Sequence, residues 1–245
     1  CKELGFKKQV ETYSIGLPNS VDLKYAKIVA EYLDTDHTQI IVREKEFLHM
    51  LDHTIYTTET YDTTSIRASV GNYLVSQFIR NHSDAKVIFN GDGSDEVSGG
   101  YLYFHCAPDN NAFDEECRRL LKEIHYFDVL RSDRSISSNG LEARTPFLDK
   151  DFVTSYFSIP IELRNHNSSR NCEKYLIRDA FKGYLPDKVL YRTKEAFSDG
   201  VSGEKSWFEI IRDHIGNIEM KEQDYPEWEN ISPVSYTHLR AHETR

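Results

Sequence analysis

The chain has 245 residues, a formal net charge of −10 at pH 7 and an isoelectric point near 5.5. This length is sufficient for one sizeable domain or for a domain and a half. The acidic balance and the lack of a lysine- and arginine-rich tract exclude a broad nucleic-acid-binding surface, although a local basic pocket is compatible with them. No apolar run reaches the roughly eighteen residues that a membrane-spanning helix requires, so we expect no membrane partner.

The cysteines and the first residues indicate the compartment. Cys1, Cys106, Cys117 and Cys172 are widely spaced and form no Cys-x-x-Cys pair. In a chain of this size, such spacing favours reduced thiols over a disulfide framework. The opening residues, CKELGFKKQV, lack the apolar core of a signal peptide. We therefore expect a cytoplasmic protein.

The first part of the chain alternates between strand and helix patterns. We expect strands at residues 10–15, 39–42 and 87–89, and helices at residues 22–33, 46–56 and 66–79. Asp22 is expected to cap the first of these helices. The unbroken apolar run at 87–89 predicts a strand that is buried on both faces. This alternation is typical of a doubly wound, mostly parallel sheet, in which ligands bind at the carboxyl ends of the strands.

From residue 113 onward the pattern becomes helical. We expect helices at residues 113–130 and 173–184, the second ended by Pro186. The sequence therefore predicts an α/β fold in which a doubly wound, mostly parallel sheet is followed by a helical C-terminal part.

The most informative stretch reads KVIFNGDGSDEVSGG, at residues 86–100. An apolar strand, a glycine-containing turn and a polar helix start are the geometry that directs backbone N–H groups at an anion. Gly91 and Gly93 can adopt positive φ and let the backbone approach a ligand. Asp92, Asp95 and Glu96 crowd the same turn, where they repel one another unless a cation is present. A hard divalent cation that carries phosphate oxygens fits both observations.

Two common motifs are excluded by counting along this turn. No Gly-Lys-[Ser/Thr] closes it, so it is not a Walker A loop. An EF-hand loop that began at Asn90 would need glycine and glutamate where Asp95 and Tyr101 stand. An acidic, solvated turn before a helix remains open from these residues alone.

Motifs along the chain resemble the family of glutamine-hydrolysing asparagine synthetases. They are ETYDTTSIRAS at 59–69, NGDGSDEVSGGYLYFH at 90–105, GLEARTPFLDK at 140–150 and KEAFSDGV at 194–201. They follow the family's order, and the resemblance covers most of residues 9–203. It implies an adenine-nucleotide α-hydrolase-like fold and a carbon–nitrogen ligase that uses ATP and Mg²⁺. Such an enzyme converts aspartate into a β-aspartyl adenylate, and ammonia obtained from glutamine then displaces AMP.

The resemblance also assigns roles to individual residues. Arg67 and Lys194 match catalytic residues that neutralise charge at the reacting phosphate, and Asp92 matches a carboxylate of the aspartate and ammonia pocket. Asp95 matches the carboxylate that binds magnesium pyrophosphate. The residues that match nucleotide contacts or the lining of the cleft are Ile15, Thr64, Ser65, Asn90, Gly91, Asp128 and Arg131.

A structural role is the alternative for several of these residues. Ile15 suits an ordinary strand core, and Arg67 suits a helix-start surface position. Lys194 beside Glu195 suits a solvated ion pair. Asp128 and Arg131, three residues apart, suit a pair on one helical face. Glu142 and Arg144, which precede the Pro-Phe-Leu-Asp motif, resemble the family's architecture rather than its chemistry.

The chain also departs from the family. The family's nucleotide loop, Ser-Gly-Gly-Leu-Asp-Ser-Ser, and its glutaminase domain are missing, so we interpret residues 1–233 as a partial synthetase domain that is inactive alone. Cys1 precedes Lys-Glu-Leu rather than a glycine-rich turn, so we do not interpret it as the glutaminase nucleophile. Residues 234–245 match the translation of a sequencing adapter and are interpreted as an artificial or disordered tail.

Asn90 and Asp92 replace the serine and glutamate of the family motif, which leaves alternatives open. One is a related ATP-pyrophosphatase that adenylates another carboxylate, as a β-lactam-forming synthetase does. Another is a catalytically silent paralogue that binds nucleotide or a subunit. A homodimer of the full-length protein is a further expectation.

Overall fold

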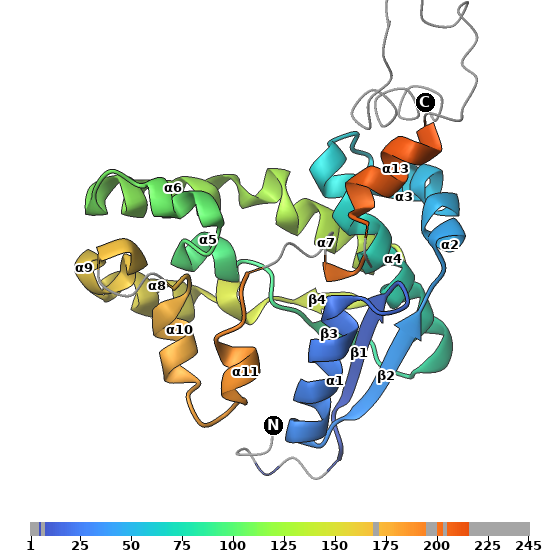
Figure 1. Cartoon of the computed structure of the whole chain (residues 1–245), viewed down its shortest axis with the longest axis horizontal. Helices are drawn as coiled ribbons and strands as arrows, with labels where there is room; N and C mark the ends of the chain where they lie inside the picture. Colours follow the sequence, from blue (N-terminus) through green and yellow to red (C-terminus); the bar gives the residue numbers. More distant parts are fainter. Residues whose placement is uncertain (1–4, 6–7, 169–171, 195–199, 203–204, 216–245) are drawn as a thin grey trace, which may run out of the picture.

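The computed structural model describes residue 5 and residues 8–168, 172–194, 200–202 and 205–215. Cys1 and the predicted tail at 234–245 lie outside these residues. The described part is a mixed α/β fold in which helices predominate. Figure 1 shows helix α1 (Val21–Leu33) with strands beside it on one side and helices on the other, with helix α7 (Asp128–Ser137) and further strands between them.

The strands form two small parallel sheets. β1 (Glu11–Gly16) pairs with β2 (Asp36–Ile41), and β3 (Val87–Phe89) pairs with β4 (Glu142–Arg144). In the first sheet Glu11 lies opposite Asp36, and in the second Val87 lies opposite Glu142. The predicted strands are thus confirmed with small shifts in their ends.

The connection between β1 and β2 is helix α1 (Val21–Leu33). Its cap is Ser20, whose hydroxyl accepts a hydrogen bond from the backbone N–H of Leu23 (3.4 Å). The prediction that Asp22 caps this helix is therefore wrong. Asp22 lies in the first turn, and its carboxylate forms an ion pair with Arg192 (2.9 Å).

Helices α2 (Glu44–His49), α3 (Leu51–Thr58) and α4 (Thr63–His82) follow β2. The predicted single helix at 46–56 is wrong, because the chain turns at Met50 between α2 and α3. This turn lets both short helices bury their apolar residues. With α4 and α13 (Trp207–Ile215) they enclose the main core, whose members include Phe47, Leu51, Ile55, Ile66, Val70 and Trp207.

The rest of the described chain is mostly helical, as predicted, but its helices are shorter than expected, and β4 was not predicted. They are α5 (Ser94–Ser98), α6 (Asn110–Glu123), α7 (Asp128–Ser137), α8 (Lys150–Ser158), α9 (Ile161–Arg164), α10 (Tyr175–Ala180) and α11 (Asp187–Leu190). Phe127 has a non-helical backbone (φ −123°, ψ −105°), so the predicted helix at 113–130 is two helices. Lys174 has a left-handed backbone, so the predicted helix at 173–184 begins only at Tyr175.

The prediction that β3 is buried on both faces is wrong. Phe89 is 73 % exposed and Val87 is 44 % exposed. The reason is a groove of about 680 Å³ beside β3, which is lined by residues of β1, α4, β3 and α7. The apolar run therefore faces an open groove rather than a second neighbouring strand.

Two further findings concern the cysteines and the helices. Cys106, Cys117 and Cys172 form no disulfide. Within the described residues, no helix combines the length and the apolar character that would let it cross a bilayer.

Candidate functional site

The loop after β3 is fixed to β4 and α7 by one asparagine. The backbone N–H of Asn90 donates to the carbonyl of Arg144 (3.0 Å), which extends the pairing of β3 with β4. Its side-chain amide donates to Ser132 Oγ (2.9 Å), and its side-chain oxygen accepts from the N–H of Asp92 (3.2 Å). Asn90 therefore sets the position of the turn that carries the acidic residues.

Of the two glycines in this loop, Gly91 and Gly93, only Gly93 has a backbone conformation that favours glycine. Gly93 has φ 87°, and a Cβ there would lie 2.3 Å from Leu148 Cδ2. Gly91 does not have a positive φ, so that expectation holds for Gly93 alone. A Cβ on Gly91 would meet no atom within 4 Å, so the space beside this backbone is open to a ligand.

Asp95, in the first turn of α5, lies between two lysines. Lys194 Nζ is 2.9 Å from Asp95 Oδ2, and Lys174 Nζ is 3.0 Å from Asp95 Oδ1. Burial alone would raise the pKa of the Asp95 carboxyl, but the two ammonium groups outweigh it and hold that pKa below its usual value. Asp95 is therefore a charged carboxylate.

Lys174 is one of the residues of this site that the sequence did not predict. Its side chain is 20 % exposed, and burial lowers the pKa of its ammonium group in spite of Asp95. In the sequence it stands between Glu173 and Tyr175, where it is typical of a surface lysine at a helix start. The left-handed backbone (φ 58°) that directs it inward has no sequence signal in a residue other than glycine or asparagine.

The residue after Asp95 begins a buried polar network. Glu96 is 4 % exposed and contacts the hydroxyl of Tyr101. The same hydroxyl lies 2.7 Å from Asp128 Oδ2, and Asp128 Oδ1 accepts from Arg131 Nε (2.7 Å). Lys194 joins the two parts of the site, because its ammonium lies 5.7 Å from the centre of the Tyr101 ring.

Below about pH 7 this network holds one proton more than two charged carboxylates would. A hydroxyl has a single hydrogen, so Tyr101 cannot donate to Glu96 and Asp128 together. Burial and the neighbouring Asp128 raise the pKa of Glu96 to about 7. Burial opposes the charge on Asp128, but Arg131 and the network's hydrogen bonds lower the Asp128 pKa to about 2. Glu96 is thus the member that carries the proton.

Asp92 is the third carboxyl group of the turn. Its Oδ2 is buried and has no hydrogen-bond partner among the described residues. Burial raises its pKa, although Ser132 and Arg131 act in the opposite direction. A buried carboxyl group with an unused oxygen, beside the groove next to β3, is suited to bind a polar substrate group or to exchange a proton with it.

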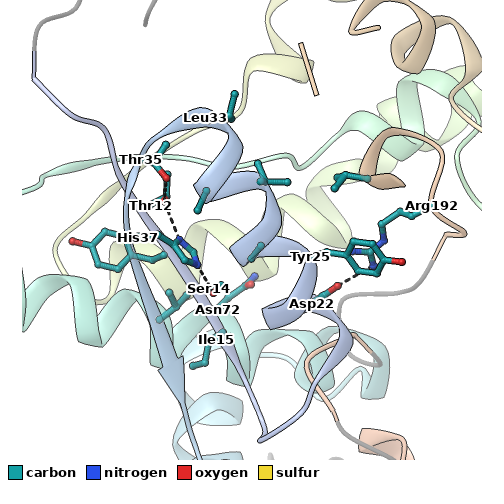
Figure 2. Close-up of a pocket in the computed structure, with 16 residues that line it drawn as sticks. Thr12, Ser14, Ile15, Asp22, Tyr25, Leu33, Thr35, His37, Asn72 and Arg192 are labelled. Carbon is teal, nitrogen blue, oxygen red and sulfur yellow. Dashed lines mark hydrogen bonds and ion pairs between the residues drawn. The ribbon is translucent and has the colours of Figure 1, made fainter. Parts of the chain in front are cut away.

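A second cavity, of about 480 Å³, lies between α1 and β1 (Figure 2). Inside it, the two ring nitrogens of His37 lie 2.9 Å from Thr12 Oγ1 and 3.0 Å from Ser14 Oγ. Burial lowers the pKa of His37. Because both ring nitrogens have partners, this histidine serves the packing of β1 on β2. Ile15 lines the same cavity.

Comparison with known proteins identifies the family. A family model described as asparagine synthase matches residues 4–112 and 107–227 of the chain. The chain belongs to the asparagine synthase family. It is similar to proteins named "Asparagine synthetase [glutamine-hydrolyzing]" from Gallus gallus (46 % identical), Mus musculus (45 %) and Homo sapiens (43 %). Each comparison runs over 217 residues and covers 87 % of this chain but 38 % of the relative. The chain thus spans well under half the length of these relatives.

The structure brings together most of the residues that the asparagine synthase resemblance predicts. Contacts connect Asn90, Asp92, Asp95, Asp128, Arg131 and Lys194, and Gly91 lies in the same loop. The solvated-pair alternative for Lys194 is wrong in its main point, since its side chain is only 18 % exposed and binds Asp95. Asp128 and Arg131 do form the pair expected on one helical face, and Tyr101 and Glu96 make that pair part of the site.

The other predicted site residues of this asparagine synthase family member lie outside the network around α5. Thr64 and Ser65 begin α4, where the backbone N–H of Ser65 donates to the capping residue Asp62 (2.6 Å). Arg67 Nε is buried without a hydrogen-bond partner among the described residues, and its guanidinium lies 5.7 Å from the Phe208 ring centre. Ile15 is 4 % exposed in the main core. None of the described hydrogen bonds or ion pairs links these residues to α5, so their predicted roles stay predictions.

The donor set around Asp95 is compatible with Mg²⁺. Mg²⁺ is usually held by one or two carboxylates together with substrate phosphates and waters, rather than by a cage of protein ligands. Among the described residues no group of three or more His, Cys, Asp or Glu side chains forms such a cage. Asp95 supplies one carboxylate, whose Oδ1 lies 3.0 Å from the Lys174 ammonium group. A single carboxylate of this kind fits a metal that also binds phosphate.

Proposed function

We propose that this chain is the aspartate-activating part of a glutamine-dependent asparagine synthetase. The observation that carries the proposal is the loop between β3 and α5, where the Asp95 carboxylate meets Lys174 and Lys194 beside the buried Asp128–Arg131 pair. One connected network therefore holds cations that can neutralise phosphate charge and polar groups that can bind an amino-acid substrate. The family membership of the chain supports the same conclusion.

In the first step, the β-carboxylate of aspartate attacks the α-phosphorus of ATP and pyrophosphate leaves. Negative charge develops on the phosphate oxygens, and Lys194 is the cation that we assign to it. Mg²⁺, held by Asp95, would supply further neutralisation of the leaving pyrophosphate. We keep Arg67 as a second phosphate-binding residue, because its Nε is buried and has no described hydrogen-bond partner.

In the second step, ammonia attacks the activated carboxyl group and AMP leaves. The ammonia nitrogen must lose a proton as the amide forms. Asp92 is the carboxyl group that we assign to this pocket, since it lies beside the groove next to β3 and keeps one oxygen unpaired among the described residues. We expect the ammonia to come from glutamine, which the names of the relatives also mention.

We further propose that the two sheets are parts of one doubly wound sheet. The groove of about 680 Å³ lies between β1 and β3, and the exposed side chains of β3 line it. A strand that leads to the family's Ser-Gly-Gly-Leu-Asp-Ser-Ser loop would fill this groove and place the loop beside Gly91. On this proposal, residues 1–233 are a partial domain that needs that segment for activity, and residues 234–245 do not take part. We also propose a cytoplasmic protein that forms a homodimer at full length.

Exchange of radiolabelled pyrophosphate into ATP tests the proposal in the full-length protein, because this exchange reports adenylate formation alone. Lys194→Ala should lower the exchange rate on the order of 10²–10³-fold while ATP binding changes little. The matched control is Lys188→Ala, an exposed lysine of α11, which should leave exchange unchanged. Aspartate-independent exchange, or unchanged exchange in Lys194→Ala, would contradict the proposal.

A second candidate function follows from the loop itself. Asn90 binds both Ser132 and the backbone of Asp92, so these two residues form one unit that differs from the family motif. Such a unit suits a related ATP-pyrophosphatase that activates another carboxylate. The same exchange assay with aspartate, glutamate and N-carboxymethylated amino acids separates the two functions, since the true substrate gives the fastest exchange.

A further inference from the structure

The carboxyl group of Asp92 is held only in part by the contacts of its own turn. The backbone N–H of Asp92 donates to Asn90 Oδ1 (3.2 Å), which fixes the backbone but not the side chain. Oδ2 of the side chain is buried without a hydrogen-bond partner among the described residues. A group that exchanges a proton with a bound substrate must be aligned with it, because misalignment lowers the rate steeply. Another residue must therefore orient this carboxyl group.

Ser132, in α7, is the residue that the turn contacts. It is 2 % exposed, and its Oγ lies 2.9 Å from the side-chain nitrogen of Asn90. The orientation of the Asn90 amide is fixed, since only the amide oxygen can accept from the N–H of Asp92. The amide nitrogen therefore donates and the serine oxygen accepts. The hydrogen of the Ser132 hydroxyl is left for another acceptor.

The backbone of α7 does not use this hydrogen. A serine inside a helix often donates to the carbonyl four residues earlier. Ser69 and Ser76 of α4 do so, at 2.6 Å and 2.7 Å. Among the hydrogen bonds of the described residues, the Ser132 hydroxyl occurs only with Asn90, where it accepts. Its hydrogen is thus available to a group outside the helix.

The carboxyl group of Asp92 is the acceptor that the surroundings offer. Burial raises the pKa of Asp92, and the Ser132 hydroxyl is the group that opposes this effect most, so it stabilises the charged form. Asn90, Asp92 and Ser132 also line the same groove of about 680 Å³ next to β3. A hydrogen bond from Ser132 to Asp92 would close a ring that begins at the Asp92 N–H and passes through Asn90.

We propose that Ser132 is a positioning residue of the ammonia step, because its hydroxyl donates to the Asp92 carboxyl group and leaves Oδ2 directed into the groove. In that step a bond forms between the ammonia nitrogen and the activated carbon, and the bond from that carbon to AMP breaks. Oδ2 of Asp92 accepts the proton that the nitrogen loses. Ser132 sets the direction of the carboxyl group, whereas its reach depends on the length of the side chain. This inference rests on the proposed function, because it refines the second step of the same reaction.

The first test separates the two steps in the full-length protein, with ammonium chloride as the nitrogen source. Ser132→Ala should lower kcat for asparagine formation by about tenfold, because Asp92 loses its alignment. Aspartate-dependent exchange of pyrophosphate into ATP should stay unchanged in this variant, since the exchange does not include ammonia. Ser132→Thr keeps the hydroxyl and should retain most of kcat. Circular dichroism and the melting temperature establish that each variant is folded.

Ser135→Ala is the matched control for this test. Ser135 is a second buried serine of α7, and its Oγ has no hydrogen-bond partner among the described residues. It is not among the residues that line the groove next to β3. Its replacement should leave both the exchange rate and kcat unchanged.

The second test asks whether Ser132 acts through Asp92. Asp92→Asn alone should lower kcat for asparagine formation, since an amide cannot take up the proton in place of a carboxylate. Ser132→Ala added to this variant should lower kcat little further, because residues that act as a unit have non-additive effects.

Three results would overturn the inference. They are an unchanged kcat in Ser132→Ala, a folded Ser132→Thr that loses as much kcat as Ser132→Ala, and losses that multiply when Ser132→Ala and Asp92→Asn are combined. The proposed function is tested separately, by the dependence of exchange on aspartate and on Lys194. Normal exchange behaviour together with an unchanged kcat in Ser132→Ala would reject the role of Ser132 and leave the proposed function standing.

Discussion

Asp95 and Glu96 are neighbours in α5, but they have opposite surroundings. Asp95 lies between two lysines, which lower its pKa in spite of burial. Glu96 contacts the Tyr101 hydroxyl and lies beside Asp128, and burial with this second carboxylate raises its pKa to about 7. One turn of helix therefore presents a charged carboxylate on one side and, on the other, a carboxyl group that is about half protonated at neutral pH.

The difference shows that the surroundings, and not the residue type, decide what each group can do. The Asp95 carboxylate stays charged because two ammonium groups lie beside it. The Glu96 side holds a proton at near-neutral pH, where a small change of environment moves it. Arg131 decides which carboxyl group of the network takes the proton. Its ion pair keeps Asp128 charged, so the proton binds to Glu96.

Replacing Arg131 should have the largest effect on the surroundings of Glu96, and the effect is measured as a loss of stability. Arg131→Met leaves the partly buried Asp128 without its cation, so we expect the free energy of unfolding to fall by up to about 3–5 kcal/mol. Urea denaturation followed by circular dichroism measures it. The control is Arg119→Met, whose ion pairs with Glu116 and Glu123 are solvent-exposed and contribute about 0–1 kcal/mol. Equal losses in the two variants would mean that the network is no more than a surface ion pair.

The next prediction concerns the proton on Glu96. Its pKa is about 7 in the folded protein and 4.5 in the reference state, so the folded protein binds more protons between these values. Stability should therefore fall as pH rises from about 4.5 to about 7, by up to about 3 kcal/mol. The lowered pKa of Asp128 acts in the opposite direction, but only below about pH 4.

Glu96→Gln carries no titrating proton and should flatten this part of the stability profile. Glu115→Gln, an exposed carboxyl group of α6, should leave the profile as it is. Denaturation midpoints at a series of pH values measure both. A slope that survives in Glu96→Gln would assign the proton to another group.

The smallest expected effect belongs to Asp92, the remaining carboxyl group of the turn. Glu at this position would reach about 1.5 Å further, and misplacement by about 1 Å can cost on the order of 10²-fold in rate. The groove beside Asp92 has room for the extra methylene. We expect Asp92→Glu in the full-length protein to raise kcat for asparagine formation by up to about 10²-fold, with little change in the KM for ATP. Steady-state kinetics with aspartate measure this. A lower or unchanged kcat would contradict the prediction and would indicate that Asp92 and Asn90 together suit another carboxylate substrate.

The sequence predicted local features of the fold well where a single segment determines them. The strand at Val87–Phe89 has the predicted bounds, because a short β-branched and aromatic run between polar turns has few alternatives. Its burial could not be predicted, since the exposure of Phe89 depends on what lies beside β3 in space. The helix cap at Ser20 rather than Asp22 shows a similar limit, because both residue types are good caps and backbone geometry decides between them.

The predicted site residues were found where a motif places them around one turn. Asn90, Asp92 and Asp95 share the loop after β3, so local spacing alone brings them together. Lys174 was missed because its position depends on Arg178 and on a left-handed backbone, and neither leaves a pattern in the sequence. Its partner Lys194 was recognised only through the resemblance of the segment around it.

The parallel pairing of β3 with β4 has a consequence for the order of assembly during synthesis. β4 follows α7 in the chain, so β3 has no described pairing partner until Glu142–Arg144 has left the ribosome. Glu96, Tyr101 and Asp128 all precede β4, whereas Lys174 and Lys194 come after it. The residues of the Glu96 network are therefore all synthesised before the two lysines that contact Asp95.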